Sequence, residues 1–202
     1  MKKVITILAI TSTIMILPGC FGITNDTPAT DSQTTQTGTP VPQNFSIYQA
    51  SDFSIAHPSA WEILKKEDFT SNVPTSTIAI FRNNIKNDIF TSNLNISQSA
   101  INEGVTSSDF GLQTLTTEKY NLVGFTEIKR ENYTIGEGEK AIQSFITTFQ
   151  GRKTITENLI EFKQLCIARN GYGIIITAAY LPNEDQTVTA NIETMIKSFK
   201  FN

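Results

Sequence analysis

The sequence is poor in the residues that form catalytic and metal centres. It contains one histidine, His57, and two cysteines, Cys20 and Cys166. A zinc site needs three or four protein ligands, so these residues cannot build one. The chain also lacks the G-x-S-x-G motif of a nucleophile elbow and the G-x-x-x-x-G-K-[ST] motif of a phosphate loop. No enzymatic activity and no cofactor are therefore expected, although a glycosidase-type pair of carboxylates from distant segments stays open.

Positive charge is scarce as well. The chain has 16 Lys and Arg residues against 19 Asp and Glu, a net charge of −3. If Lys2 and Lys3 leave with a cleaved leader, 14 remain and the net charge becomes −5. Such an acidic surface argues against nucleic acid or anionic lipid as the main partner. The hydrophobic share of 39% and the length of 202 residues fit one globular domain with short additions.

The apolar run near the N-terminus is too short to cross a bilayer. Val4 to Leu17 has 14 uncharged residues and follows Lys2 and Lys3. A spanning helix needs about 20 apolar residues. A positive start followed by a run of this length is typical of a signal peptide that is later removed. We therefore expect residues 1–19 to be a signal peptide.

The end of this run resembles a known processing motif. The residues Leu17-Pro18-Gly19-Cys20 resemble the lipobox of bacterial lipoproteins, although Pro18 replaces the usual small residue. The resemblance implies cleavage between Gly19 and Cys20, diacylglycerol on the Cys20 sulfur and often a further acyl chain, such as palmitate, on the new amine. Two acyl chains hold a protein stably on a membrane. This implies a place in the cell envelope, on the outer face of the plasma membrane or on the outer membrane.

The segment that follows has the composition of a flexible tether. Residues 21–44 are rich in Thr, Pro, Gln and Asn and contain no Lys or Arg. Such a segment buries too little apolar surface to offset the entropy lost on ordering. We expect residues 20–44 to link the lipid to a domain at residues 45–202. With Cys20 lipidated, no disulfide with Cys166 is expected.

From Phe45 onward the pattern changes to that of a folded domain. Strands are expected at residues 45–50, 52–58, 61–67, 77–82 and 93–100. A helix is expected near residues 109–120, with Ser107 or Ser108 as its cap, although Gly111 and several threonines weaken it.

The second half carries clearer turn signals. Residues 125–135 and 139–149 are predicted to form a hairpin across Gly136-Glu137-Gly138. A second hairpin is predicted across Asn170-Gly171, because this pair accepts the positive φ angles of a type I′ turn. The nearly continuous apolar run at residues 173–179 predicts a central strand.

A C-terminal amphipathic helix is predicted to open at Pro182-Asn183. One stripe at helical spacing is expected to be buried, while Glu193 is expected to point away from it; the stripe is Val188, Ile192, Met195, Ile196 and Phe199. About seven to nine strands and two helices result. The predicted fold class is α+β, with a mainly antiparallel sheet between helices.

The domain resembles PsbP/Mog1-like domains. The resemblance begins with the phrase Phe53-Ser54-Ile55-x-His57-Pro58-Ser59-x-Trp61 and includes the hairpin at residues 170–172. It ends with the helix NIETMIKSF and a short FKF strand. It implies an α-β-α sandwich over residues 45–202 and a role in binding other proteins. The family has no common functional site, so the resemblance assigns no active residue.

Four sites remain as candidates for chemistry. His57 before Pro58 is interpreted as packing at a strand end, and Cys166 in a strand pattern as a buried, inert thiol. Glu137 and Glu139 lack the loop pattern of a calcium site, so a solvated hairpin tip is favoured. Trp61 is interpreted as a core residue, with a partner-facing aromatic side chain as the alternative.

These observations favour a monomeric, membrane-anchored lipoprotein that binds a protein partner in the cell envelope and has no catalytic function. The alternative is a carrier of a small molecule or envelope lipid in a groove between sheet and helices. An apolar cavity along residues 142–149 and 172–180 would favour the carrier. A filled core with an exposed aromatic patch would favour the protein-binding module.

Overall fold

The computed structural model describes residues 42–70, 72–85 and 87–202. Within them the chain forms two α-helices, α1 (Ser107–Asn121) and α2 (Gln186–Lys197), and two 3-10 turns, Lys66–Asp68 and Gly138–Lys140. It also forms ten strands: β1 (Phe45–Gln49), β2 (Phe53–Pro58), β3 (Glu62–Lys65), β4 (Thr77–Arg82), β5 (Asn93–Ala100), β6 (Val123–Ile135), β7 (Ile142–Arg152), β8 (Ile160–Arg169), β9 (Tyr172–Tyr180) and β10 (Lys200–Phe201).

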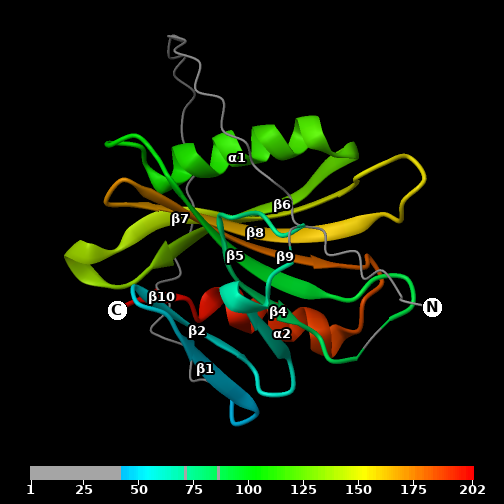
Figure 1. Cartoon of the computed structure of the whole chain (residues 1–202). Coiled ribbons are helices and arrows are strands. Elements are labelled where there is room, and N and C mark those ends of the chain that lie inside the picture. The colour runs from blue at the N-terminus through cyan, green and yellow to red at the C-terminus, as the bar shows by residue number, and fades with distance from the viewer. Residues whose placement is uncertain (1–41, 71, 86) are drawn as a thin grey trace.

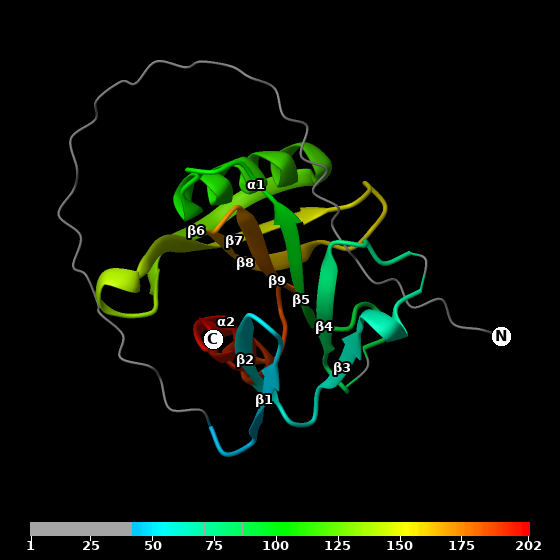
Figure 2. The ribbon, with the colours of Figure 1, turned by 60° about the vertical axis from the view of Figure 1, so that its left-hand side comes forward.

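The strands form two sheets, and every pairing between described strands is antiparallel. The large sheet has seven strands in the order β3-β4-β5-β9-β8-β7-β6, and the small sheet has the order β1-β2-β10. Helix α1 covers one face of the large sheet, whereas α2 and the small sheet lie on the other (Figures 1 and 2). The predicted α+β class, with an antiparallel sheet between helices, is confirmed. The second covering layer also contains a small sheet that the sequence did not predict.

The β8–β9 hairpin forms as the sequence predicts. Asn170 and Gly171 have φ angles of 52° and 76°, the positive values that a type I′ turn requires. The turn places β9 in the middle of the large sheet, between β5 and β8. Because both faces of β9 are covered, seven of its nine residues are buried.

Helix α1 begins earlier than predicted and has a different cap. The Thr106 side chain accepts a hydrogen bond from the Asp109 backbone N–H at 3.1 Å, so Thr106 is the N-cap and the prediction of Ser107 or Ser108 was wrong. The Ser107 hydroxyl instead accepts from the Ala168 N–H on β8 at 2.8 Å. Gly111 lets the helix approach the sheet closely, since a Cβ there would lie 2.7 Å from the Phe145 ring.

Helix α2 begins at Gln186, three residues beyond the predicted opening. Its N-cap is Asp185, whose carboxylate accepts from the Thr187 N–H at 2.7 Å. The predicted stripe is confirmed, since all five of its residues are buried: Val188, Ile192, Met195, Ile196 and Phe199. The orientation predicted for Glu193 was wrong. Its carboxylate reaches the sheet, where it pairs with Lys163 of β8, and it also contacts Lys197 at 2.6 Å.

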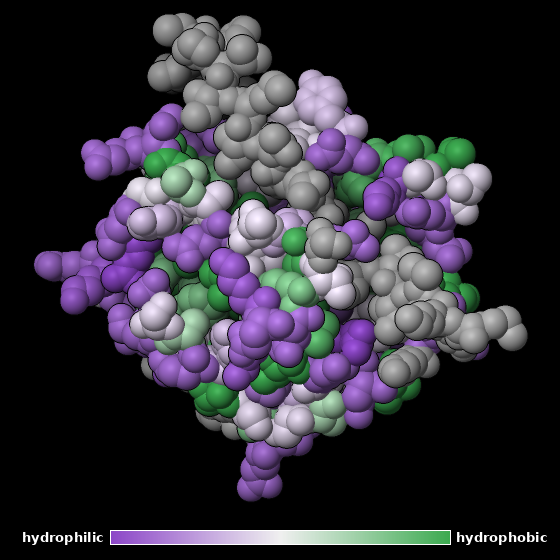
Figure 3. Space-filling model, viewed as in Figure 1, coloured by the Kyte–Doolittle hydropathy of each residue, from purple (hydrophilic) through white to green (hydrophobic). Residues whose placement is uncertain are grey.

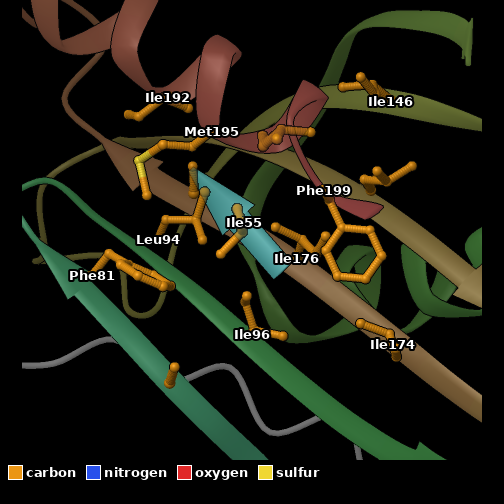
Figure 4. Packing of buried hydrophobic residues seen from close by; sticks show 14 of the residues in the cluster. Ile55, Phe81, Leu94, Ile96, Ile146, Ile174, Ile176, Ile192, Met195 and Phe199 are labelled. Carbon is orange, nitrogen blue, oxygen red and sulfur yellow. The ribbon is translucent and has the colours of Figure 1, made fainter. Parts of the chain in front are cut away.

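The main core lies between the large sheet, α2 and the small sheet. Figure 4 shows Ile192 and Met195 pointing from α2 toward the strands that carry Ile55, Leu94 and Ile176. Ile55, Leu94, Ile176 and Ile192 are completely buried. Burial of one such side chain contributes about 1.5–3 kcal/mol, so this layer provides much of the stability of the fold.

Candidate functional site

His57 lies in the core, in agreement with its interpretation as packing at a strand end. The side chain is 4% exposed, and its Nδ1 donates to the Pro58 carbonyl oxygen at 2.9 Å. Its ring lies 5.3 Å from the ring of Phe81 on β4. Trp61 is also buried in the main core, so the core interpretation of that residue is confirmed.

The other candidates fall at separate places. Cys166 lies in β8 as a buried thiol, and burial raises its pKa to about 12. Glu137 and Glu139 are exposed at the β6–β7 turn. Within the described ranges, no three His, Cys, Asp or Glu side chains are placed together as metal ligands. The predicted signal peptide with Gly19, the lipidation site Cys20 and residues 21–41 of the predicted tether lie outside the described residues. In the part of the chain that the structure covers, no helix is both long and apolar enough to span a bilayer.

The structure reveals a row of polar side chains that crosses the large sheet beneath α1. Thr147, Gln164, Thr177 and Asn95 occupy directly paired positions on β7, β8, β9 and β5. Neighbouring strands lie about 4.8 Å apart, so the row runs perpendicular to the strands. In its middle, the Gln164 amide donates to the Thr177 hydroxyl at 3.0 Å. At its ends, the Asn95 Oδ1 and the Thr147 Oγ1 have no hydrogen-bond partner among the described residues.

Helix α1 places a carboxylate on this row. Glu118 is 1% exposed, and its Oε2 atom has no hydrogen-bond partner among the described residues. Burial raises the pKa of Glu118 to about 7, and a side-chain hydrogen bond with Gln164 acts in the opposite direction. Desolvation disfavours the charged form of a carboxyl group, which explains the direction of this shift. Glu118 therefore stays protonated to a higher pH than an ordinary carboxyl group.

Glu118 and part of the polar row line a small cavity. The cavity has a volume of about 60 Å³ and lies beside α1, over β4, β5, β8 and β9. Its polar lining includes Glu118, Gln164, Thr177, Asn95 and Ser97. This volume holds a few water molecules or a small polar group. Near the start of β4 and the end of β5, four residues are shared with the lining of a second, larger hollow: Ser76, Thr77, Gln98 and Ser99.

The larger hollow is an open groove of about 580 Å³, bounded by the β1–β2 turn, the end of β3 and the start of β9. Tyr48 and Tyr172 contribute aromatic rings to it, and Lys65, Lys66 and Glu67 contribute charge. Tyr172 is 52% exposed. Burial raises the pKa of Tyr48, and the Glu67 carboxylate adds to this effect. On the side of the molecule seen in Figure 3, apolar residues form small patches among hydrophilic ones.

Sequence reasoning found neither the polar row nor Glu118, although two signals were available. Glu118 lies four residues after Thr114 and eight after Phe110, both buried, so helical spacing places it on the sheet-facing side of α1. Thr177 interrupts the apolar run of β9, and the predicted hairpin places Gln164 of β8 opposite it. Polar residues at such positions need partners, which marks them as a network and not as a solvent-exposed face.

Comparison with known proteins identifies solved structures with a similar fold. No family model matches the chain, and no match to a curated protein was found. Among solved structures, LpqN of Mycobacterium tuberculosis, which is involved in cell envelope biogenesis, is similar with a TM-score of 0.52 at 15% identity, over 78% of this chain and 90% of its own.

Two further structures share the fold. Cyanobacterial PsbP of Synechocystis matches with a TM-score of 0.51 at 15% identity, over 84% of this chain and 98% of its own. The Ran-binding protein Mog1p of Saccharomyces cerevisiae matches with a TM-score of 0.50 at 12% identity, over 77% and 94%. At these identities the likeness concerns the fold, and it supports the PsbP/Mog1-like architecture that the sequence resemblance implied.

Proposed function

We propose that the protein is a lipoprotein of the bacterial cell envelope, anchored by lipid on Cys20, whose domain binds a partner protein without catalysis. The observation that carries the binding role is the open groove beside the β1–β2 turn. Its open form and its exposed Tyr172 suit a protruding segment of a partner. Tyrosine is enriched in protein interfaces because it combines a large apolar ring with a polar end.

The similar folds support this proposal only by analogy. Mog1p is a Ran-binding protein, and LpqN is involved in cell envelope biogenesis. A shared fold does not carry a shared function, so neither partner nor pathway is transferred. What transfers as a hypothesis is the general mode, namely a compact domain that presents a surface to another protein.

The alternative, a lipid carrier, has less support. A carrier would need an apolar cavity along β7 and β9, but the side chains of these strands are packed. On one face Ile146 and Ile176 belong to the main core with α2. On the other face the rings of Phe149 and Phe162 stack with centroids 5.1 Å apart. The cavity beside α1, at about 60 Å³, is far below the several hundred Å³ of a pocket for a lipid-sized ligand, and the larger groove is open and carries charged side chains at Asp52, Lys65, Lys66 and Glu67.

The groove proposal predicts where a photocrosslinker will capture a partner. A benzoyl-phenylalanine residue at Tyr172 is expected to give a discrete crosslinked adduct on living cells. Tyr120 provides the matched control, because it is a more exposed tyrosine (85%) that lies on α1, across the large sheet from α2 and the small sheet. Adducts at both positions in equal yield, or at Tyr120 alone, would refute a specific contact at the groove.

The anchoring proposal predicts that Cys20 carries fatty acid. Cells grown with an alkyne fatty acid should incorporate the label into the wild-type protein and not into the Cys20→Ala variant. The first lipid is expected to attach to the sulfur of the lipobox cysteine, and the variant lacks this sulfur. The check is gel fluorescence after coupling a dye to the alkyne. Label of equal intensity in both proteins would rule out this anchor.

A further inference from the structure

The cavity beside α1 is lined by two buried hydrogen-bond acceptors that have no donor among the described residues. Glu118 is 1% exposed, and its Oε2 has no partner among the described residues. The Asn95 Oδ1, also buried and without a partner there, belongs to a second residue of the same lining. The Thr177 hydroxyl accepts one hydrogen bond, from Gln164, and retains a second lone pair. A buried acceptor without a donor costs about 1–3 kcal/mol, and more when it is charged.

We propose that this cavity is a binding site for a primary ammonium group. An ammonium group carries three N–H donors and no acceptor, so it complements a site of this composition. Its charge would offset that of the Glu118 carboxylate, and its three donors would meet Glu118, Asn95 and Thr177. The cavity, at about 60 Å³, has room for the ammonium group and a short part of its carbon chain. This inference is independent of the proposed protein partner.

The charged groups around the cavity favour a cationic ligand. On β8, the titratable neighbour of Glu118 is Cys166, which is neutral because burial raises its pKa to about 12. On β6, Arg130 lies over the Phe145 ring and is paired with Glu127 at 2.9 Å, so its charge is already balanced. The residues that β5 and β9 contribute to the lining are uncharged.

Binding of an ammonium group requires ionised Glu118, which couples the site to pH. Burial raises the pKa of Glu118 to about 7, so the group is mostly protonated at pH 5 and mostly ionised at pH 8. A small amine such as methylamine keeps its charge over this range, since its pKa is close to that of lysine. The affinity is therefore expected to rise on the order of 100-fold from pH 5 to pH 8.

The experiment titrates the purified protein with methylammonium chloride at constant ionic strength. Nitrogen–proton spectra of side-chain amides provide the readout at pH 5 and pH 8. We expect saturable shifts of the Asn95 and Gln164 amide signals, at far lower concentration at pH 8. Glu118→Gln keeps the shape of the side chain and removes its charge, so it should abolish saturation. Thr177→Val keeps the volume and removes one acceptor, so it should weaken binding several-fold and leave the pH dependence intact.

Three controls separate ammonium recognition from general ionic effects. Tetramethylammonium has the charge but no N–H donor and should not saturate these signals. Glu103→Gln removes an exposed carboxylate and should leave binding of methylammonium unchanged. Potassium chloride should fail to saturate the site. Saturation by potassium at the same concentration, saturation of the Glu118→Gln variant, or absence of any shift at pH 8 would each overturn the proposal.

Discussion

Glu118→Gln is expected to stabilise the protein by about 3 kcal/mol at pH 8 and by less than about 1 kcal/mol at pH 5. The pKa of Glu118 is raised from 4.5 to about 7 in the folded protein, mainly by burial. Between these two values the folded state binds more protons than the unfolded state. The stability of the wild type therefore falls as the pH rises through this window and levels off above about pH 7.5. The glutamine variant does not titrate here and escapes this loss.

Urea unfolding at pH 5 and pH 8 measures the effect, with the free energy of unfolding compared between variant and wild type at each pH. Glu103→Gln is the matched control because Glu103 is exposed in the loop before α1, and it should change stability little at either pH. A stability difference for Glu118→Gln that is the same at both pH values would show that Glu118 titrates as an ordinary carboxyl group. The experiment needs no added amine, so its outcome is separate from that of the ligand titration.

The expected gain from glutamine bears on why a carboxyl group is found there. A neutral amide of the same shape would remove the desolvation cost of the charge at neutral pH. Buried groups with strongly shifted pKa values concentrate at functional sites, where binding or catalysis takes precedence over stability. An ammonium ligand would supply such a purpose, because its binding energy offsets the cost that the buried charge imposes on the unliganded protein.

The β8–β9 hairpin can be predicted from the sequence, and with it the pairing of Gln164 and Thr177 in the polar row. Asn170-Gly171 sets a two-residue turn, so Arg169 must pair with Tyr172. Counting back along both strands from that pair brings Gln164 opposite Thr177, which is the pairing that the folded protein shows. A local turn signal is thus enough to determine one half of the polar row.

The other half of the site depends on contacts between distant segments. Asn95 lies opposite Thr177 because β5 pairs with β9. Gly171, in the turn that precedes β9, comes 76 positions after Asn95, so the two strands are far apart in the sequence. No turn signal sets this pairing. The small sheet was missed for the same reason, since β10 joins β2 across most of the domain through only two paired positions, Lys200 with Ser54 and Phe201 with Phe53. The N-cap residues were missed for a different reason. Thr106 and Asp185 have polar neighbours with a similar capping preference, so the sequence alone does not single out either residue.

Ile192→Asp is expected to destabilise the domain by several kcal/mol, enough to unfold much of the protein at 25 °C. Ile192 is completely buried in α2 and packs in the main core (Figure 4). Aspartate there loses the apolar contacts of isoleucine, and its carboxyl group either carries an unpaired charge into the core or must be protonated. Loss of a few kcal/mol is a large part of the stability of a domain of this size.

Two variants on the same helix test whether burial is the cause. Ala190→Asp introduces the same carboxylate at an exposed position of α2 and should change the free energy of unfolding by less than about 0.5 kcal/mol. Glu193→Ala removes the partner of Lys163 and Lys197 and should cost about 0.5–1 kcal/mol, because this cluster is partly exposed. Urea unfolding curves should therefore rank the midpoints as Ala190→Asp above Glu193→Ala and both far above Ile192→Asp. Equal midpoints for Ile192→Asp and Ala190→Asp would mean that the two faces of α2 are assigned the wrong way round.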